Sequence, residues 1–257
     1  MPLLQAEDIQ VRFGGLIALD GARLLVEEGH ITGLIGPNGA GKTTMFNVIC
    51  GLQEHVRGHV FLDDRDITKL KPFQRARRGI ARTFQRLEIF GSLTVYENVL
   101  MGAETKRRYS NHKFDPRTAT RSLLATLGLE RVADVRADAM PTGMARLVEL
   151  ARALATKPRV LLLDEPSSGL GDQESDEFAD LLLRLTGEGL GILLVEHDVD
   201  LVMRVCDQIF VLDFGRPIAQ GTPAEIQAHP AVQAAYLGTA EGAEELLEMG
   251  EEEEVPA

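Results

Sequence analysis

One eight-residue stretch organises the rest of the chain: Gly36-Pro37-Asn38-Gly39-Ala40-Gly41-Lys42-Thr43. It matches the pattern G-x-x-x-x-G-K-[ST], in which a glycine-rich turn joins a strand to a helix. Residues 31–35 before it form a short apolar run typical of a buried strand, and residues 44–50 after it favour the first turns of a helix. Backbone N–H groups and the helix dipole concentrate positive potential at such a turn. The stretch therefore predicts an anion site.

The residue types in this stretch suit the phosphates of a nucleoside triphosphate. Lys42 would reach the β- and γ-phosphates, and Thr43 would offer its hydroxyl group to Mg²⁺. Thr44, which directly follows, is counted with the nucleotide-binding residues because it opens the helix. We therefore predict that the chain binds a nucleoside triphosphate. The pattern alone does not distinguish kinases, GTPases and motors, so the rest of the chain has to identify the class.

Two later apolar runs lead into polar residues suited to phosphate chemistry. Residues 160–163 lead into Asp164 and Glu165, and residues 192–195 lead to His197. Runs that are apolar on both faces are typical of parallel strands, whose carboxyl ends meet at the edge where ligands bind. Asp164 would hold Mg²⁺ directly or through water, and Glu165 would orient or polarise the attacking water. His197 is placed to contact the γ-phosphate, although a histidine at a strand end is more often structural when taken alone.

The order of these parts resembles the ATPase subunit of an ATP-binding-cassette (ABC) transporter over roughly residues 3–238. The parts are the phosphate loop, Gln85 in Arg82-Thr83-Phe84-Gln85, a long helical insert, residues 160–165 and His197. Several segments further resemble the subunits that drive uptake of branched-chain and other hydrophobic amino acids. These segments are residues 12–16, 80–85, 93–100, 221–226 and 235–238.

The resemblance implies an α/β fold. Its core would be a P-loop NTPase with a mostly parallel sheet, preceded by an antiparallel β portion at about residues 3–30. A helical signature subdomain would span about residues 90–155, within a single domain of residues 1–238. The resemblance also implies that ATP and Mg²⁺ are the cofactors and that ATP hydrolysis is coupled to solute transport.

The resemblance assigns further roles by position. Phe13 would stack on adenine, Gln85 would approach Mg²⁺ or the attacking water, and His197 would be the switch histidine. The implied metal ligands are Thr43, Gln85 and Asp164. The alternatives are a strand residue packed in the core for Phe13 and an ordinary surface glutamine for Gln85.

The chain departs from the family at the signature, which usually reads L-S-G-G-Q and contacts the γ-phosphate bound by the opposite subunit. Here the segment is Met140-Pro141-Thr142-Gly143-Met144. Pro141 has neither a hydroxyl group nor an N–H group, whereas Thr142 offers a displaced hydroxyl and Gly143 keeps a close backbone approach. Losing one charge-assisted hydrogen bond of about 1.5–3 kcal/mol would weaken this contact about tenfold or more. A helix is still predicted to follow, because proline suits a helix start and Leu147, Leu150 and Leu154 have helical spacing.

A second departure follows the two acids. Gly171 stands where the family has an aspartate that contacts the other subunit, and Asp172 comes one residue late. Asp172 suits the N-cap of a helix over residues 173–185 equally well. Both departures fall on surfaces that serve the partner's nucleotide, while the chain's own phosphate loop and acids are complete. We therefore expect a heterodimer with a related ATPase, with a homodimer as the alternative.

The other expected partners follow from the same resemblance. The ATPase pair would lie beneath transmembrane permease subunits, with a solute-binding protein contributing indirectly. The chain would then be peripheral, at the cytoplasmic face of the plasma membrane. The permease and the solute-binding protein select the solute, so the residues of this chain do not specify it.

Composition agrees with this expectation. Hydrophobic residues make up 44% and charged residues 26%, which is ordinary for a soluble globular protein. No apolar run approaches the roughly 18 residues of a membrane span, and no cleavable signal opens the chain. The net charge of −12 arises largely from residues 239–257, which hold eight glutamates and no lysine or arginine; without those glutamates it is −4. That stretch predicts a disordered acidic tail, with a short helical turn near residues 244–249.

Three local features complete the expectations. A basic run predicts a solvated helix face or one turned toward membrane or permease, and the overall acidity argues against nucleic acid as a partner. Asp115-Pro116 predicts a loop over residues 112–120, and residues 208–221 predict a hairpin that turns at Phe214-Gly215. The basic run consists of Lys69, Lys71, Arg75, Arg77, Arg78, Arg82 and Arg86.

Two other functions share the predicted nucleotide site. A soluble ABC ATPase of repair or translation usually carries coiled-coil insertions or two fused cassettes, and the chain has neither. A binding-only nucleotide module with weak hydrolysis is suggested by the altered signature, but Glu165 and His197 argue against it.

Overall fold

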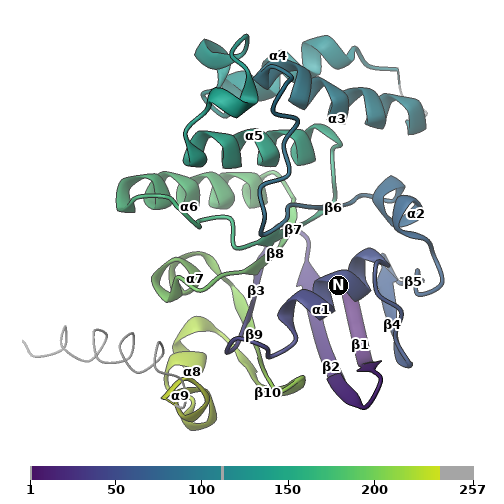
Figure 1. Ribbon diagram of the computed structural model, residues 1–257. Coiled ribbons are helices and arrows are strands. Elements are labelled where there is room, and N and C mark those ends of the chain that lie inside the picture. Colours follow the sequence, from purple (N-terminus) through teal and green to yellow (C-terminus); the bar gives the residue numbers. More distant parts are fainter. Residues whose placement is uncertain (1, 111–112, 238–257) are drawn as a thin grey trace, which may run out of the picture.

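The polypeptide is built on two β-sheets, with helices at both ends of the molecule and beside the sheets (Figure 1). The computed structural model describes residues 2–110 and 113–237. The larger sheet has the strand order β10-β9-β3-β8-β7-β6, in which β3, β6, β7, β8 and β9 are parallel and β10 is antiparallel. Its strands are β3 (Ile31–Ile35), β6 (Ile80–Arg82), β7 (Val160–Asp164), β8 (Gly191–Val195), β9 (Gln208–Asp213) and β10 (Arg216–Gly221).

The central strands are buried on both faces, as the apolar runs predict. Every residue of β3, β7 and β8 is buried. Alternate side chains of β7 enter two different cores, because successive residues of a strand point to opposite faces. Leu161 and Leu163 pack with helices on one face, whereas Val160 and Leu162 pack against the second sheet on the other.

The second sheet is antiparallel and contains the N-terminal strands, as expected. Its order is β2-β1-β4-β5, and it shares a core with the helix that follows the phosphate loop. The strands are β1 (Pro2–Phe13), β2 (Leu16–Glu27), β4 (Arg57–Leu62) and β5 (Arg65–Asp66), and the helix is α1 (Lys42–Cys50).

Helices α3, α4 and α5 lie at one end of the molecule (Figure 1). They are α3 (Val95–Tyr109), α4 (Pro116–Thr126) and α5 (Thr142–Ala155), with short 3-10 turns at Glu130–Val132 and Ala137–Ala139. The predicted loop over residues 112–120 is wrong beyond Asp115, because α4 begins at Pro116. Asp115 caps this helix by accepting hydrogen bonds from the N–H groups of Arg117 and Thr118, and a proline at the first position needs no donor partner.

The remaining helices connect or flank the large sheet. They are α2 (Pro72–Arg77), α6 (Asp172–Gly187), α7 (Val199–Val205), α8 (Pro223–Gln227) and α9 (Pro230–Leu237). Asp172 is not the N-cap of α6, because the helix begins at this residue and Gly171 takes the cap position. Glu174 closes the start of α6 instead by accepting the N–H group of Gly171 at 3.1 Å. The hairpin turn at Phe214-Gly215 is confirmed between β9 and β10.

The basic run is not a uniformly solvated face. Arg75 is only 2% exposed, and its guanidinium group donates to the carbonyl groups of Val48, Ile49, Thr68 and Leu70 at 2.7–3.0 Å. The side chain of Arg82 is buried as well. The expectation of a solvated face is therefore wrong for these two arginines, whereas Lys69, Lys71, Arg77, Arg78 and Arg86 are exposed as predicted.

Two expectations concern the ends of the chain and its relation to a membrane. The acidic tail and its helical turn near residues 244–249 lie outside the described residues. Within the described residues, no helix is both long and apolar enough to cross a bilayer.

Candidate functional site

The phosphate loop, residues 36–43, joins β3 to α1 as the sequence predicts. Its backbone is closed by a hydrogen bond from the N–H group of Ala40 to the carbonyl of Pro37, and the N–H group of Gly215 reaches the carbonyl of Ala40 from the β9–β10 turn. Gly36 has a φ of 147°, and a methyl group there would overlap the carbonyl oxygen of Leu212. Only glycine fits this position without displacing β9.

Lys42 is held inside the loop. Its ammonium group donates to the carbonyl groups of Gly36 and Pro37, and the residue is 7% exposed. Burial lowers the pKa of Lys42, while the nearby carboxylates of Glu165 and Asp164 act in the opposite direction. Its cationic end therefore lies beside the loop backbone and close to both predicted acids, as a phosphate-binding lysine requires.

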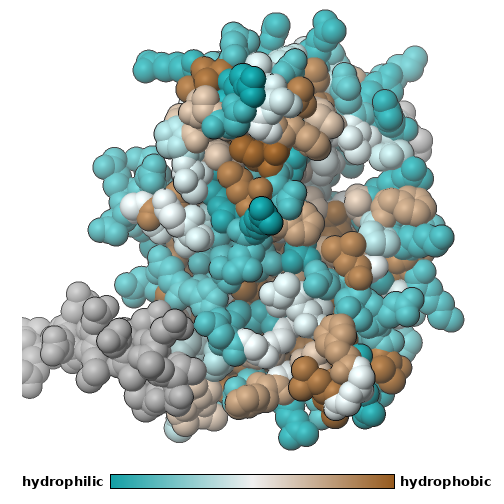
Figure 2. All heavy atoms as spheres, viewed as in Figure 1, coloured by the Kyte–Doolittle hydropathy of each residue, from teal (hydrophilic) through white to brown (hydrophobic). Residues whose placement is uncertain are grey.

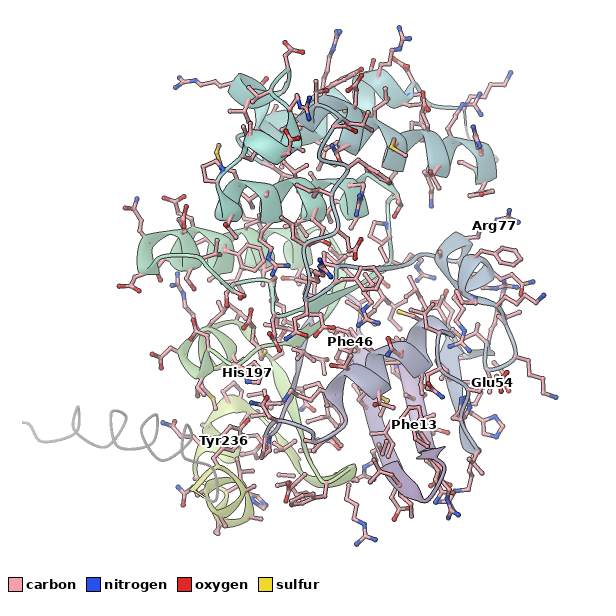
Figure 3. All side chains as sticks on the ribbon, viewed as in Figure 1. Phe13, Phe46, Glu54, Arg77, His197 and Tyr236 are labelled. Atoms are coloured by element: carbon pink, nitrogen blue, oxygen red, sulfur yellow. The ribbon has the colours of Figure 1, made fainter. Side chains whose placement is uncertain are left out.

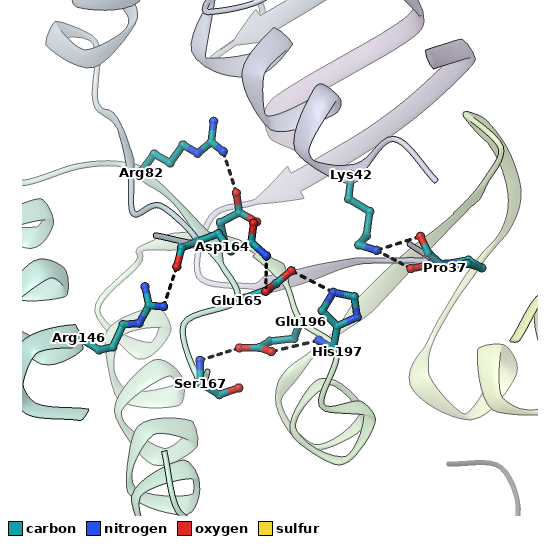
Figure 4. A network of polar contacts seen from close by, with 11 residues as sticks. Pro37, Lys42, Arg82, Arg146, Asp164, Glu165, Ser167, Glu196 and His197 are labelled. Carbon is teal, nitrogen blue, oxygen red and sulfur yellow. Dashed lines mark hydrogen bonds and ion pairs between the residues drawn. The ribbon is translucent and has the colours of Figure 1, made fainter. Parts of the chain in front are cut away.

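The two acids occupy the carboxyl end of β7, at the predicted sheet edge (Figure 4). Asp164 is 2% exposed, and its Oδ2 accepts a hydrogen bond from Arg82 at 2.7 Å. Glu165 follows with a φ of 49°, an uncommon backbone conformation for a residue with a side chain. Its carboxylate lies between two of the predicted residues, with Gln85 Nε2 donating to Oε2 at 2.8 Å and His197 Nε2 lying 2.9 Å from Oε1.

A buried carboxylate that sequence reasoning did not single out supports the histidine. Glu196 is 5% exposed and accepts the N–H groups of Ser167 at 2.7 Å and of His197 at 3.1 Å. Burial raises the pKa of Glu196, and these hydrogen bonds lower it in part. Glu196 thus ties the segment after Glu165 to the segment that carries His197. Its position just before the predicted histidine was the only available signal.

Helix α5 contacts the backbone around Gln85 through three charged side chains that sequence reasoning also missed. Arg146 donates to the carbonyl groups of Phe84 and Gln85 at 3.0 and 2.7 Å. Glu149 accepts the N–H group of Glu88 at 3.2 Å, and Arg152 donates to the carbonyl of Glu88. The spacing of three residues along one helix was the only signal for these contacts.

The altered signature and the segment after the acids form one continuous surface, which we call the signature surface (residues 140–144 and 169–174). Pro141 takes the N-cap position of α5. A methyl group on Gly143 would lie 2.9 Å from Leu170 Cδ2 and 3.1 Å from Glu174 Oε1, and one on Gly169 would lie 3.3 Å from Thr142 Cγ2. The two departures from the family pattern are therefore neighbours in space.

Phe13 lies at the end of β1, apart from the acids. It is 49% exposed and is accompanied by the exposed side chains of Leu16 and Ile17 on β2. Figure 2 shows apolar residues gathered over this end of the β1–β2 hairpin, and Figure 3 shows Phe13 well separated from His197. The structure therefore brings Gln85, Glu165 and His197 into hydrogen-bond contact beside Asp164 and the phosphate loop. Phe13 and residues 141–143 are not part of that contact.

The residues expected to hold Mg²⁺ are chemically suitable. Thr43, Gln85 and Asp164 offer hydroxyl, amide and carboxylate oxygens, the hard donors that Mg²⁺ prefers. No cluster of three or more His, Cys, Asp or Glu side chains within residues 2–110 and 113–237 is arranged to hold a metal ion by itself. This fits an ion for which the protein supplies only one or two carboxylates and the substrate phosphates supply further oxygens.

A strand, a phosphate loop with its lysine, and two acids at the end of another parallel strand of the same sheet define a P-loop nucleoside-triphosphate-binding protein. Comparison with known proteins identifies the family. The ABC transporter family model matches residues 19–168, and the model of the branched-chain amino acid ATP-binding cassette transporter matches residues 216–242. The chain therefore belongs to the ABC transporter family, as the resemblance predicts.

Individual relatives match over nearly their whole length. BraF of Pseudomonas aeruginosa, a high-affinity branched-chain amino acid transport ATP-binding protein, is 37% identical, with 93% of this chain and 99% of BraF covered. LivG of Escherichia coli, of the same description, is 38% identical with the same coverage. LptB of Escherichia coli, a lipopolysaccharide export system ATP-binding protein, is 34% identical, with 93% and 98% covered.

Solved structures confirm the predicted fold class. A nucleotide-free ATP-binding cassette from an ABC transporter superimposes with a TM-score of 0.83 at 31% identity, covering 93% of this chain and all of that one. The cbiO1 protein of Clostridium perfringens gives a TM-score of 0.79 at 30% identity, covering 96% and 99%.

Proposed function

We propose that the chain is the ATP-hydrolysing subunit of a transporter that takes up branched-chain or other hydrophobic amino acids. The observation that carries the hydrolytic part is the carboxylate of Glu165, held between Gln85 and His197 beside the phosphate loop. The amino-acid part is supported by the family match over residues 216–242 and by the role of BraF and LivG as branched-chain amino acid transport ATP-binding proteins.

Each residue of the site has a chemical task in this proposal. Lys42 and the N–H groups of residues 36–43 bind the phosphates, and Phe13 stacks on adenine. Glu165 orients the attacking water and accepts its proton, while His197 and Gln85 hold that carboxylate in place. Mg²⁺, when bound through Thr43, Gln85 and Asp164, neutralises charge on the β- and γ-phosphates. The binding-only alternative leaves the placement of Glu165 without a role.

We further propose that this chain pairs with a related ATPase beneath permease subunits at the cytoplasmic face of the plasma membrane. ABC ATP-binding subunits act as dimers with transmembrane permease components. The heterodimer is favoured because Pro141 and Gly171 both lie on the signature surface, whereas the chain's own phosphate site is complete. A purified chain that forms an ATP-dependent homodimer with rapid turnover on its own would contradict this pairing.

The test combines hydrolysis with transport. Cells that lack this chain are complemented with the wild type or with Glu165→Gln, and uptake of labelled leucine is measured with unlabelled isoleucine or a sugar as competitor. We expect wild-type uptake that isoleucine reduces and the sugar does not. Uptake with Glu165→Gln should fall about a hundredfold or more, because a positioned general base contributes about 10²–10⁴ in rate. Steady-state ATP hydrolysis by the purified proteins should fall in parallel.

The matched control is Glu54→Gln, which makes the same chemical change at an exposed position of the loop after α1. It should leave uptake and hydrolysis unchanged. Full uptake with Glu165→Gln would overturn the catalytic role of Glu165. Complementation that restores uptake of another solute but not of leucine would overturn only the assignment to amino acids.

A further inference from the structure

Arg82 of the basic run binds an acid of the nucleotide site. It ends β6, and its side chain is 7% exposed. One amino group donates to Asp164 Oδ2 at 2.7 Å (Figure 4), and the other donates to Asn47 Oδ1 at 2.6 Å. The guanidinium carbon lies 5.3 Å from the ring centre of Phe46 and 4.8 Å from that of Phe84. The guanidinium group is therefore held by two hydrogen bonds and two aromatic rings.

This pair is buried, which makes it different from the surface ion pairs of the molecule. The side chain of Asp164 is 3% exposed, whereas in Arg216–Asp20 and Arg57–Asp8 at least one partner is open to solvent. A buried carboxylate without a counterion is strongly unfavourable, so removing one partner of such a pair costs far more than breaking a surface pair. Arg82 is thus the counterion of the Asp164 carboxyl group at this depth.

The contacts of Arg82 connect three parts of the site. Asn47 belongs to α1 and follows Lys42 by five residues, and Phe46, which contacts Arg82 through its ring, lies on the same helix (Figure 3). Arg82 also precedes Gln85 by three residues, and Gln85 binds Glu165. One short segment therefore holds both adjacent acids, Asp164 through Arg82 and Glu165 through Gln85. The same segment is tied to the helix that begins at the phosphate loop.

We propose that Arg82 is a positioning residue that holds the carboxylate of Asp164 and sets how strongly nucleotide binding depends on Mg²⁺. The inference rests on the proposed role of Asp164 as a magnesium ligand. With Arg82 in place, Oδ2 of Asp164 accepts its hydrogen bond and the pair carries no net charge. The phosphates of ATP without a metal ion therefore meet little repulsion from Asp164. Without Arg82, the unpaired carboxylate repels the phosphates unless a divalent cation neutralises it.

The test measures the affinity for a fluorescent N-methylanthraniloyl ATP with and without Mg²⁺, the latter in EDTA. The quantity compared is the dissociation constant without Mg²⁺ divided by the dissociation constant with Mg²⁺. Its measurement requires no hydrolysis. In Arg82→Met, we expect this ratio to rise about tenfold or more above the wild-type value, chiefly because metal-free binding weakens. Arg82→Lys keeps a positive charge, so its ratio should stay within about threefold of the wild type. If Arg82→Met does not fold, Arg82→Gln removes the same charge and carries the same expectation.

Thermal unfolding without nucleotide gives an independent readout. Addition of millimolar Mg²⁺ should raise the unfolding temperature of Arg82→Met, because the ion replaces the missing counterion of Asp164. It should leave the wild type unchanged. In the double variant Arg82→Met with Asp164→Asn, the response to Mg²⁺ should disappear, because no unpaired carboxylate remains.

Arg75→Met is the matched control, since Arg75 is equally buried but hydrogen-bonds to backbone carbonyl groups. This variant should unfold at lower temperature yet keep the wild-type affinity ratio. An equal rise of the ratio in Arg75→Met, or no rise in Arg82→Met, would overturn the inference.

The single variant Asp164→Asn tests the magnesium role of Asp164, on which the inference about Arg82 rests. If the Mg²⁺ dependence is unaffected by that change, the magnesium role of Asp164 fails, whereas the role of Glu165 in hydrolysis is tested separately by uptake.

Discussion

The chain's own phosphate site and its signature surface differ in how completely each keeps the residues of the family pattern. At the phosphate site, the family residues Lys42, Asp164 and Glu165 are all present, and each side chain is held by a hydrogen bond. At the signature surface, Pro141 has no N–H or hydroxyl group to offer, and Gly171 has no side chain. The residues proposed to serve the chain's own nucleotide therefore keep the family pattern, whereas two of those proposed to face a partner's nucleotide do not. This difference is the support for the proposed heterodimer with two unequal sites.

The largest expected effect comes from adding a methyl group to Gly36 of the phosphate loop. In Gly36→Ala, the methyl group would overlap the backbone carbonyl of Leu212 at a φ of 147°, so the loop and β9 must separate. Overpacking and backbone strain each cost about 1–3 kcal/mol, so we expect a loss of about 3 kcal/mol or more in the free energy of unfolding. Binding of MgATP should fall below detection. Urea unfolding and nucleotide titration measure the two effects.

Gly143→Ala is the counterpart on the signature surface. Its methyl group would meet only the ends of the side chains of Leu170 and Glu174, which can move aside. We expect a loss of about 1 kcal/mol or less, at the low end for overpacking, and unchanged binding of MgATP to the chain's own site. Equal losses in the two variants would show that the side chains around Gly143 yield no more readily than the backbone around Gly36.

A smaller effect is expected when the missing hydroxyl group is restored. Pro141→Ser returns a donor to the signature, and a hydrogen bond to a charged group contributes about 1.5–3 kcal/mol. We expect ATP turnover by the purified chain to rise about tenfold, since two copies then offer each other a more complete signature. Pro141→Ala restores the N–H group without the hydroxyl and should give a smaller gain. Unchanged turnover in Pro141→Ser would show that the signature does not limit the reaction.

The smallest effect concerns the contact that joins the two regions. Glu149 lies on the signature helix α5, is 2% exposed and binds the backbone beyond Gln85. Burial raises the pKa of Glu149 above its usual 4.5, although the N–H groups of Glu88 and Phe84 and the charges of Arg146 and Arg152 lower it in part. The folded chain therefore binds this proton more tightly than the unfolded chain. The resulting stability is present below pH 4.5 and is lost as pH rises through the raised pKa.

Glu149→Gln removes this titration. The free energy of unfolding of the variant, measured relative to the wild type by urea titration, should therefore increase as pH rises from 4.5 toward neutrality. Glu196 also has a pKa raised by burial, but it is present in both proteins and cancels in the difference. Parallel stability curves across this range would contradict the prediction.

The sequence predicted the parts of the molecule that local patterns determine. The phosphate loop has a motif that requires its strand and helix, and the buried strands β7 and β8 are continuous apolar runs. The start of α4 was missed because Asp115-Pro116 suits both a loop and a capped helix start. Choosing between them requires knowledge of what residues 116–126 pack against. The N-cap of α6 was misplaced by one residue for a similar reason. Glu174, which lies within the first turn of the helix, accepts the N–H group of Gly171, so the cap residue needs no side chain of its own.

The missed parts of the site depend on contacts between distant residues. A run of seven basic residues gives no sign that Arg75 and Arg82 turn inward, since their partners lie on α1 and β7. The contacts of Arg146 and Glu149 with the backbone around Gln85 likewise join residues about sixty positions apart. Backbone carbonyl and N–H groups are present at every position, so a sequence pattern does not show which of them a charged side chain will bind.

Arg75 has a consequence for the entropy of nucleotide binding. Its guanidinium group donates to the carbonyl groups of Val48 and Ile49 at the C-terminal end of α1, where the last carbonyl groups lack intrahelical donors and the helix dipole is negative. The last turn of this nine-residue helix is therefore secured at the end opposite the phosphates. Phosphate binding then orders only the loop and the first turn, and less conformational freedom is lost than in a helix that frays at both ends.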